Sequence, residues 1–143
     1  MPYSFEFAAP QRMFRSRFDG HVSADDVRQF IEFATTFADD RGGSIVGIVD
    51  FSDVKNFELS PPDIHELASR PPVIRDREAL RFIIAPSPFI YGLARMFELL
   101  GQETRPNLHV VRSQKEVWVI LGIEEPKFEP VALPDESADA TGA

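Results

Sequence analysis

The sequence contains no cysteine among its 143 residues. Disulfides, thiolate metal sites and cysteine nucleophiles are therefore excluded. No apolar run approaches the roughly 20 residues that a membrane-spanning helix needs. The opening residues, MPYSFEFAAP, include an acid and lack the basic segment of a secretory signal peptide. We therefore expect a cytoplasmic protein without integral membrane association.

Positive charge is also scarce, because 15 lysines and arginines stand against 23 acids and give a net charge of −8. The last 21 residues hold six acids and one lysine, so this tail carries −5 and the rest of the chain −3. The stretch RPPVIRDREALR holds Arg70, Arg75, Arg77 and Arg81, but two acids alternate with them. This mixture is typical of a solvated loop rather than a nucleic-acid-binding stripe. We expect no nucleic-acid partner.

Catalytic motifs are missing as well. His21, His65 and His109 have no partner at metal-ligand spacing and no carboxylate in a recognised arrangement. The sequence has no nucleophile elbow, phosphate-binding glycine loop or dinucleotide fingerprint. We therefore predict a protein that is not an enzyme, with no catalytic residues, no cofactor and no metal.

The length fits one domain, and strands alternate with helices along most of it. Residues 3–7 and 12–20 alternate as an antiparallel hairpin, and short apolar runs at 44–52, 80–86 and 108–111 are typical of buried strands. Helical patterns fill 23–42, 60–70, 87–101 and 113–122. The prediction is an α/β fold with a mixed sheet of about five strands, in which an N-terminal antiparallel hairpin precedes parallel βα units. Residues 1–122 form this domain, and residues 123–143 form an acidic, proline-containing and loosely held tail.

The stretch APSPFIYGLARMFELLG, residues 85–101, predicts a capped helix. Ser87 is the expected N-cap, Pro88 suits the first turn, and Gly101 is expected to end the helix in a left-handed conformation. The residues expected to face the sheet are Phe89, Leu93, Met96, Phe97 and Leu100. Gly92 costs roughly 1 kcal/mol relative to alanine inside a helix. We interpret this cost as a sign of close packing, or of a ligand contact at Tyr91 and Gly92.

Parallel sheets bind ligands beyond the carboxyl ends of their strands. In this sequence those ends lead to polar residues and to helix N-termini that could hold an anion or a phosphate. The residues of this predicted rim are Asp50, Ser52, Ser60, Ser87 and Ser113. The alternative is that each serine only caps its own helix and that the aspartate forms a turn.

Three stretches resemble bacterial STAS-like proteins of the SpoIIAA-like group: DFSDVKNFELSPPDIHELA, APSPFIYGLARMFELLG and LHVVRSQKEVWVILG. The resemblance implies the fold of anti-sigma-factor antagonists, a group related to CRAL-TRIO-like lipid-binding proteins. It also places Ser60 near the phosphorylated serine of those antagonists. The local sequence ELSP departs from their Asp-Ser-Ser-Gly pattern at the first serine and at the glycine.

Both faces of the central strands are apolar, since Ile45 and Val49 point one way and Val46 and Ile48 the other. An uncovered face favours self-association. We therefore predict a non-enzymatic regulatory or protein-interaction module that forms a homodimer or binds a protein partner. The alternative is a small-molecule or lipid-binding protein that uses an apolar pocket or the rim. The pocket would be formed by Phe5, Phe7, Phe30, Phe37, Phe89 and Phe97. A deep apolar cavity would favour the alternative, and a filled core with a flat apolar patch would favour the module.

Overall fold

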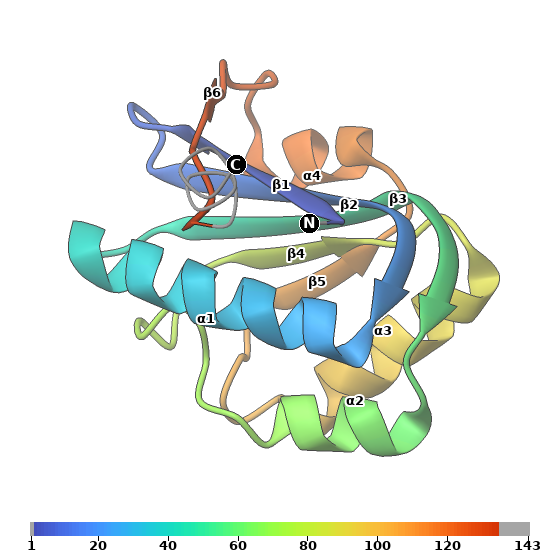
Figure 1. Cartoon of the computed structure of the whole chain (residues 1–143). Helices are drawn as coiled ribbons and strands as arrows, with labels where there is room; N and C mark the ends of the chain where they lie inside the picture. Colours follow the sequence, from blue (N-terminus) through green and yellow to red (C-terminus); the bar gives the residue numbers. More distant parts are fainter. Residues whose placement is uncertain (1, 135–143) are drawn as a thin grey trace.

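A six-stranded mixed sheet forms the centre of the computed structural model, which describes residues 2–134 (Figure 1). Its strands are β1 (Tyr3–Ala8), β2 (Met13–Ser23), β3 (Val46–Glu58), β4 (Arg81–Ile84), β5 (Leu108–Val111) and β6 (Glu129–Pro130). They lie in the order β5-β4-β3-β2-β1-β6. Strand β1 pairs antiparallel with β2 and β6, and all other neighbours are parallel. The predicted fold class is confirmed, with one strand more than expected.

The four helices divide unequally between the two faces of the sheet. Helices α1 (Ala24–Arg41), α2 (Pro61–Ala68) and α3 (Pro88–Leu100) cover one face, and α4 (Gln114–Leu121) lies on the other (Figure 1). The first three connect consecutive parallel strands, and crossovers of the same hand place them on the same side. No parallel strand follows α4. We call the two sides the three-helix face and the α4 face.

Three helices begin with reciprocal capping bonds, as their sequences predict. The side chains of Ser23, Ser60 and Ser113 each accept from the backbone amide three residues on, where an acid bonds back to the serine amide. Ser87 is the N-cap residue of α3, as predicted, but its side chain makes no capping hydrogen bond. Helix α3 still begins there, because Pro88 is pre-set for the first turn and has no amide to satisfy.

Helix α3 is rotated relative to the predicted orientation. Its buried residues are Ile90, Leu93 and Ala94, whereas Phe89 is 60% and Leu100 45% exposed. The predicted sheet-facing stripe is therefore wrong at both of its ends, because the helix packs along a line through Ile90 rather than Phe89. Gly101 ends the helix at φ −108°, so the predicted left-handed cap is also wrong.

Gly92 is exposed, and a Cβ built there would meet no atom within 4 Å. The interpretation of close packing at this glycine is wrong. A glycine that does permit a close approach is Gly47 in β3, where a Cβ would lie 2.7 Å from the Cζ atom of Phe14. The ring of Phe14 thus occupies the space above the start of β3 on the three-helix face.

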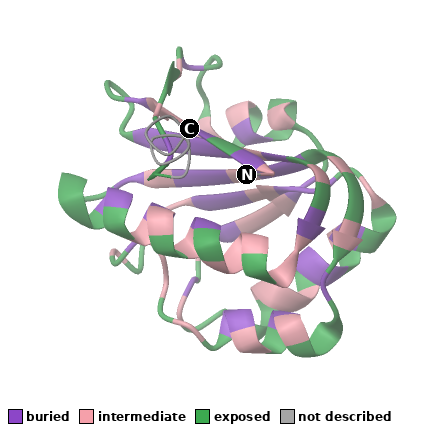
Figure 2. Cartoon of the chain, viewed as in Figure 1, coloured by how far each residue is buried: buried purple, intermediate pink, exposed green. Residues whose placement is uncertain are grey.

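The larger of two apolar clusters lies on the three-helix face and is rich in aromatic rings. Phe5 stacks on Phe14 at a centroid distance of 5.0 Å and contacts Phe33 and Phe37 edge-on at 4.9 and 4.8 Å. Phe33 is half-buried against this cluster, at the margin of the core as expected. Figure 2 shows the buried residues concentrated in the sheet and on the inner sides of the helices.

The segment after α4 packs against the sheet instead of hanging free. Strand β6 pairs with β1, and the Val131 amide donates to the Phe5 carbonyl at 2.9 Å. Leu133 is 1% exposed, and Phe128 lies on the α4 face. The prediction of a loosely held tail is wrong for residues 128–133. Their apolar side chains pack against both faces of the sheet, Phe128 on the α4 face and Leu133 on the three-helix face. Residues 135–143 of that tail lie outside the described residues.

Candidate functional site

The predicted rim begins at Asp50, which is 4% exposed and lies inside β3 rather than at its end. Its Oδ1 accepts from the amide and hydroxyl of Ser52 at 2.9 and 2.5 Å. Its Oδ2 accepts from Nε2 of Gln114, at the start of α4, at 3.0 Å. The expected strand end is wrong, since pairing with β2 continues to Glu58. Asp50 therefore joins β3 to α4.

The three rim serines at helix starts, Ser60, Ser87 and Ser113, are not bonded to one another. Strand β3 continues for eight residues beyond Asp50, about 26 Å of extended chain at 3.3 Å per residue, before Ser60 begins α2. Ser113 begins α4 on the other face. Within residues 2–134, no hydrogen bond joins Ser60, Ser87 and Ser113 to one another. A ligand at this rim stays a prediction.

Ser60 is exposed, and its hydroxyl donates to Oδ2 of Asp63 at 3.0 Å. The Asp63 carboxylate also accepts from the Ser60 amide at 2.9 Å. These two bonds, the amide first, hold the pKa of Asp63 below its usual range. The hypothesis that Ser60 is a phosphoacceptor stays open, and the hydroxyl is engaged with an acid in this structure.

A buried arginine on the α4 face has full charge compensation. Arg15 is 4% exposed and bonds to Glu6, to Gln114 at 2.7 Å and to Glu125 at 3.1 Å. Its guanidinium carbon also lies 4.1 Å from the centroid of the Phe128 ring. Two carboxylates therefore offset one buried cation, and the group holds β1, β2, α4 and the C-terminal segment together.

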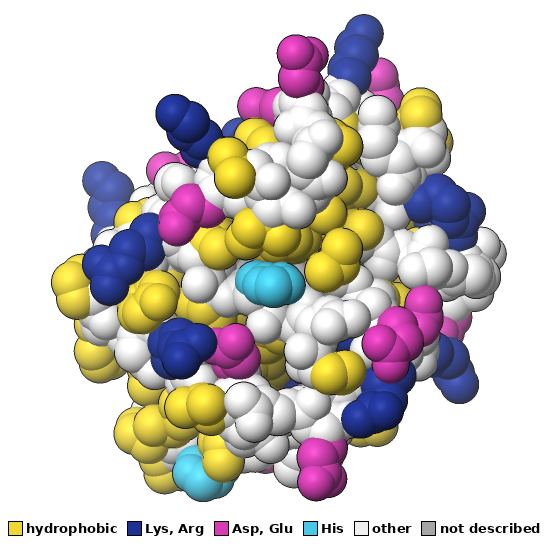
Figure 3. All heavy atoms as spheres, turned by 180° about the vertical axis from the view of Figure 1, so that it is seen from behind, with side chains coloured by type: hydrophobic (Ala, Val, Ile, Leu, Met, Phe, Trp, Pro, Cys, Tyr) yellow, Lys and Arg dark blue, Asp and Glu magenta, His cyan; other side chains and the backbone are white. Residues whose placement is uncertain are grey.

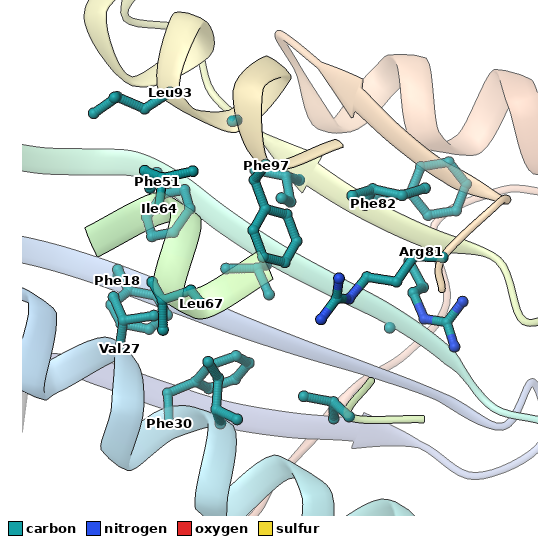
Figure 4. A pocket seen from close by; sticks show the side chains of 18 of the residues that line it. Phe18, Val27, Phe30, Phe51, Ile64, Leu67, Arg81, Phe82, Leu93 and Phe97 are labelled. Carbon is teal, nitrogen blue, oxygen red and sulfur yellow. The ribbon is translucent and has the colours of Figure 1, made fainter. Parts of the chain in front are cut away.

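An apolar cavity of about 150 Å³ lies on the three-helix face, between the sheet and helices α1, α2 and α3. Figure 4 shows Phe18, Val27 and Phe30 on one side of it and Arg81 with Phe82 on another. Ile64 and Leu67 of α2 and Leu93 and Phe97 of α3 complete much of the wall. The cavity reaches the surface beside Arg70 and the exposed Pro71.

Arg81 lines this cavity and is only 7% exposed. Its two terminal nitrogens donate to carbonyl oxygens of the preceding loop, those of Ile74 at 2.6 Å, Asp76 at 2.8 Å, Ala79 at 3.2 Å and Arg77 at 3.4 Å. Its Nε is buried and has no hydrogen-bond partner. Burial lowers the pKa of Arg81, and the charge of Asp76 opposes this shift. The prediction of a solvated arginine loop is wrong at this residue.

Arg105 lines the same cavity and is also 7% exposed. It donates to the carbonyl oxygens of Ala68 at 3.4 Å and Arg70 at 2.9 Å, and lies 4.6 Å from the centroid of the Phe97 ring. Burial, together with the charge of Arg81, lowers the pKa of Arg105 to about 10, so it remains charged at neutral pH. Within residues 2–134, no carboxylate oxygen lies within 4.0 Å of either guanidinium.

The two arginines of this cavity lie at the opposite ends of the strands from the rim predicted from the sequence. Arg81 is the first residue of β4, and Arg105 precedes β5, so both lie at the amino ends. An arginine directly before the apolar run FIIA was the available signal. Tyr91 and Gly92 do not line the cavity, and Tyr91 instead lies under the Arg112 guanidinium at 4.3 Å. A ligand contact at these two residues stays a prediction.

The histidines are engaged in pairwise contacts. His21 lies 3.2 Å from Glu58 on the surface, and the His109 ring stacks on Phe82 at a centroid distance of 5.4 Å. In the part of the chain that the structure describes, no group of three acids or histidines is placed to hold a metal ion. No helix in residues 2–134 combines the length and apolarity that crossing a bilayer requires.

A solved structure with the same fold is that of the anti-sigma factor antagonist SpoIIAA in its unphosphorylated form. It superposes with a TM-score of 0.57 over 86% of this chain and 99% of that chain, at 15% sequence identity. No protein-family model matches the sequence. No curated protein matches it either. The fold is therefore SpoIIAA-like, as the resemblance in the sequence implies, and this likeness extends to the fold alone.

Proposed function

We propose that the protein is a non-enzymatic regulatory module that acts through protein contacts, and that its first partner is a second copy of itself. The SpoIIAA-like fold supports this proposal, because the protein that shares it is described as an antagonist of an anti-sigma factor. The same proposal includes a cytoplasmic location in a bacterial cell.

The observation that carries the proposal is an apolar surface on the outside of α4. Val119 is 71% and Ile120 45% exposed in the last turn of this helix, and Ile123, just after its C-cap, is 38% exposed. Figure 3 shows hydrophobic side chains gathered on the side of the molecule that is hidden in Figure 1. A self-complementary apolar patch is what a two-fold dimer requires. We call these three residues the α4 patch.

Light scattering on the full chain during gel filtration tests the dimer. We expect the wild type to elute with twice the monomer mass at micromolar concentration, and Val119→Glu to elute as a folded monomer. Leu99→Glu is the matched control, because Leu99 is 56% exposed but belongs to α3. A monomeric wild type, or a variant at Leu99 that dissociates while the variant at Val119 does not, would overturn the proposal.

A second candidate function is the binding of a small apolar molecule, which the cavity on the three-helix face favours. A cavity of this size, about 150 Å³, is comparable to engineered cavities that hold one benzene molecule. Its walls are apolar over most of their extent. Ligand-dependent shifts in NMR spectra of the full chain, titrated with benzyl alcohol, test whether the cavity takes a guest. Absence of saturable shifts would overturn this candidate.

A further inference from the structure

Arg81 and Arg105 are buried cations without anionic partners among residues 2–134. A guanidinium removed from water loses several kcal/mol of hydration unless it is paired and hydrogen-bonded. Backbone carbonyls supply hydrogen bonds and partial negative charge, and Asp76 acts on Arg81 only from beyond 4.0 Å, so neither guanidinium has a carboxylate in contact among residues 2–134. The contrast with Arg15 is direct, since that buried arginine contacts two carboxylates.

One N–H donor of Arg81, at Nε, has no hydrogen-bond partner among residues 2–134. Four carbonyl oxygens occupy its terminal nitrogens, whereas its buried Nε has no partner. Buried donors are nearly always satisfied in folded proteins, so an orphan of this kind calls for an acceptor. Arg81 lines the cavity, and Figure 4 shows its side chain beside it. The positive charge of Arg81 therefore lies in the wall of the cavity.

The remaining wall of the cavity is apolar and fits the non-polar part of a ligand. Phe18, Phe30, Leu67, Leu93 and Phe97 present only carbon atoms to it. The volume of about 150 Å³ accommodates one aromatic ring or a short branched chain, and not a long acyl chain. An apolar body of about six to nine non-hydrogen atoms, ending in an anion, would match both parts of the wall.

We propose that the cavity binds a small apolar monocarboxylate, with its carboxylate at Arg81 and Arg105 and its ring or branched chain among the phenylalanines and leucines. This inference rests on the second candidate function and adds the charge of the ligand. The carboxylate lies on the cavity side of the two guanidiniums, where Arg81 and Arg105 both form part of the wall. One negative charge then offsets the repulsion between two buried cations, and the apolar body replaces an empty space.

Three probes separate the contributions of charge and apolar body in the full-length wild type. Benzoate carries both, benzyl alcohol carries only the ring, and acetate carries only the carboxylate. Titration calorimetry and NMR in a low-chloride buffer measure their dissociation constants. We expect benzoate to bind at least tenfold more tightly than benzyl alcohol or acetate, and the shifted amide signals to lie in α2, α3 and β4.

Two arginine variants provide a matched pair. Arg105→Gln removes an uncompensated charge but retains donors for the carbonyl oxygens, and we expect it to weaken benzoate at least tenfold with no change for benzyl alcohol. Arg75→Gln is the control, because Arg75 lies outside the cavity wall and is paired with Asp39 at 2.8 Å. We expect this change to alter benzoate binding less than threefold. If Arg105→Gln does not fold, the three probes on the wild type still decide the question.

The outcomes distinguish the inference from the function on which it rests. Equal binding of benzoate and benzyl alcohol would retain a ligand cavity and overturn the role of the arginines. Equal binding of acetate and benzoate would overturn the apolar half of the inference. Failure of all three probes to bind would overturn both the inference and the second candidate function. Equal losses in the variants at Arg75 and Arg105 would overturn the assigned carboxylate position.

Discussion

At the carboxyl ends of the parallel strands, polar side chains bond to one another, whereas at the amino ends two guanidiniums bond only to backbone carbonyls. Asp50 accepts three hydrogen bonds, and Ser60 and Ser113 each form a reciprocal cap. Arg81 and Arg105 are as deeply buried as Asp50, yet have no acid within 4.0 Å in the part of the chain that the structure describes.

This difference indicates at which end of the strands ligand binding would be more favourable. Polar groups at the carboxyl ends have partners already, so a ligand there would have to displace existing bonds. At the amino ends, Arg81 and Arg105 have hydrogen-bond acceptors but no contacting carboxylate among residues 2–134. An added anion would offset their charge without displacing an existing hydrogen bond. A low local dielectric makes partly satisfied polar groups costly, and it makes their completion correspondingly favourable.

The largest effect is expected for Arg81→Ala at the amino ends. The change leaves up to four buried carbonyl oxygens without their donor, and we expect it to lower the free energy of unfolding by about 3 kcal/mol. Urea denaturation followed by circular dichroism measures this loss. Arg77→Ala in the same loop is the control, because Arg77 is exposed, and it should cost less than about 0.5 kcal/mol. Equal losses would remove the distinction between the buried and the solvated arginine.

At the carboxyl ends, the serine caps should differ among themselves. Ser60→Ala and Ser113→Ala each remove a side-chain bond to a helix amide and should lower the free energy of unfolding by about 1 kcal/mol. Ser87→Ala removes no such bond, and we expect a change near zero. Thermal and urea unfolding of the three variants give the comparison. A loss at Ser87 as large as the other two would show that its hydroxyl caps α3 after all.

A third comparison concerns two glycines of the α3 segment, Gly92 inside the helix and Gly101 at its C-cap. Gly92→Ala adds a methyl group to open space and should stabilise the protein by up to about 1 kcal/mol. Gly101→Ala would place a Cβ 2.5 Å from Nη1 of the buried Arg105, and this clash should destabilise the protein. The same urea titrations measure both signs. Stabilisation by both changes would show that the Arg105 guanidinium is free to move away.

The smallest effect is expected from acidification at the cap of α2, where water screens the exposed carboxylate. Bonds from Ser60 lower the pKa of Asp63 below its ordinary 3.8. A lowered folded-state pKa stabilises the protein above the ordinary value, and that contribution disappears as the pH falls through the folded-state pKa. We expect the wild type to be more stable than Asp63→Asn at pH 7 and the difference to shrink below pH 4. A difference that is constant with pH would contradict the assignment.

Much of the fold is accessible from local sequence patterns. Alternation predicts the β1–β2 hairpin, and three Ser-x-x-acid sequences predict the starts of α1, α2 and α4, because these patterns depend on residues a few positions apart. The orientation of α3 is not accessible in this way. Phe89 and Ile90 are equally apolar neighbours in sequence, and only the arrangement of the sheet below decides which of them is buried.

The candidate site was harder to predict for a related reason. Arg81 lies among charged loop residues in the sequence, but in the fold it is buried in the wall of a cavity that Phe14, Leu67 and Phe97 of three separate segments also line. A rule that reads arginines among acids as solvated has no access to this distant packing. The tail was misjudged because its acids dominate the composition, while Phe128 and Leu133 decide its contacts.

The pairing of β6 with β1 has a consequence for the order in which the chain folds during synthesis. Strand β1 is synthesised well before its partner, because β6 and the core residue Leu133 follow it by more than 120 residues. Until β6 has been synthesised, β1 has an unpaired outer edge, which is a template for wrong strand pairing between nascent chains. Residues 128–133 therefore complete the sheet and protect this edge.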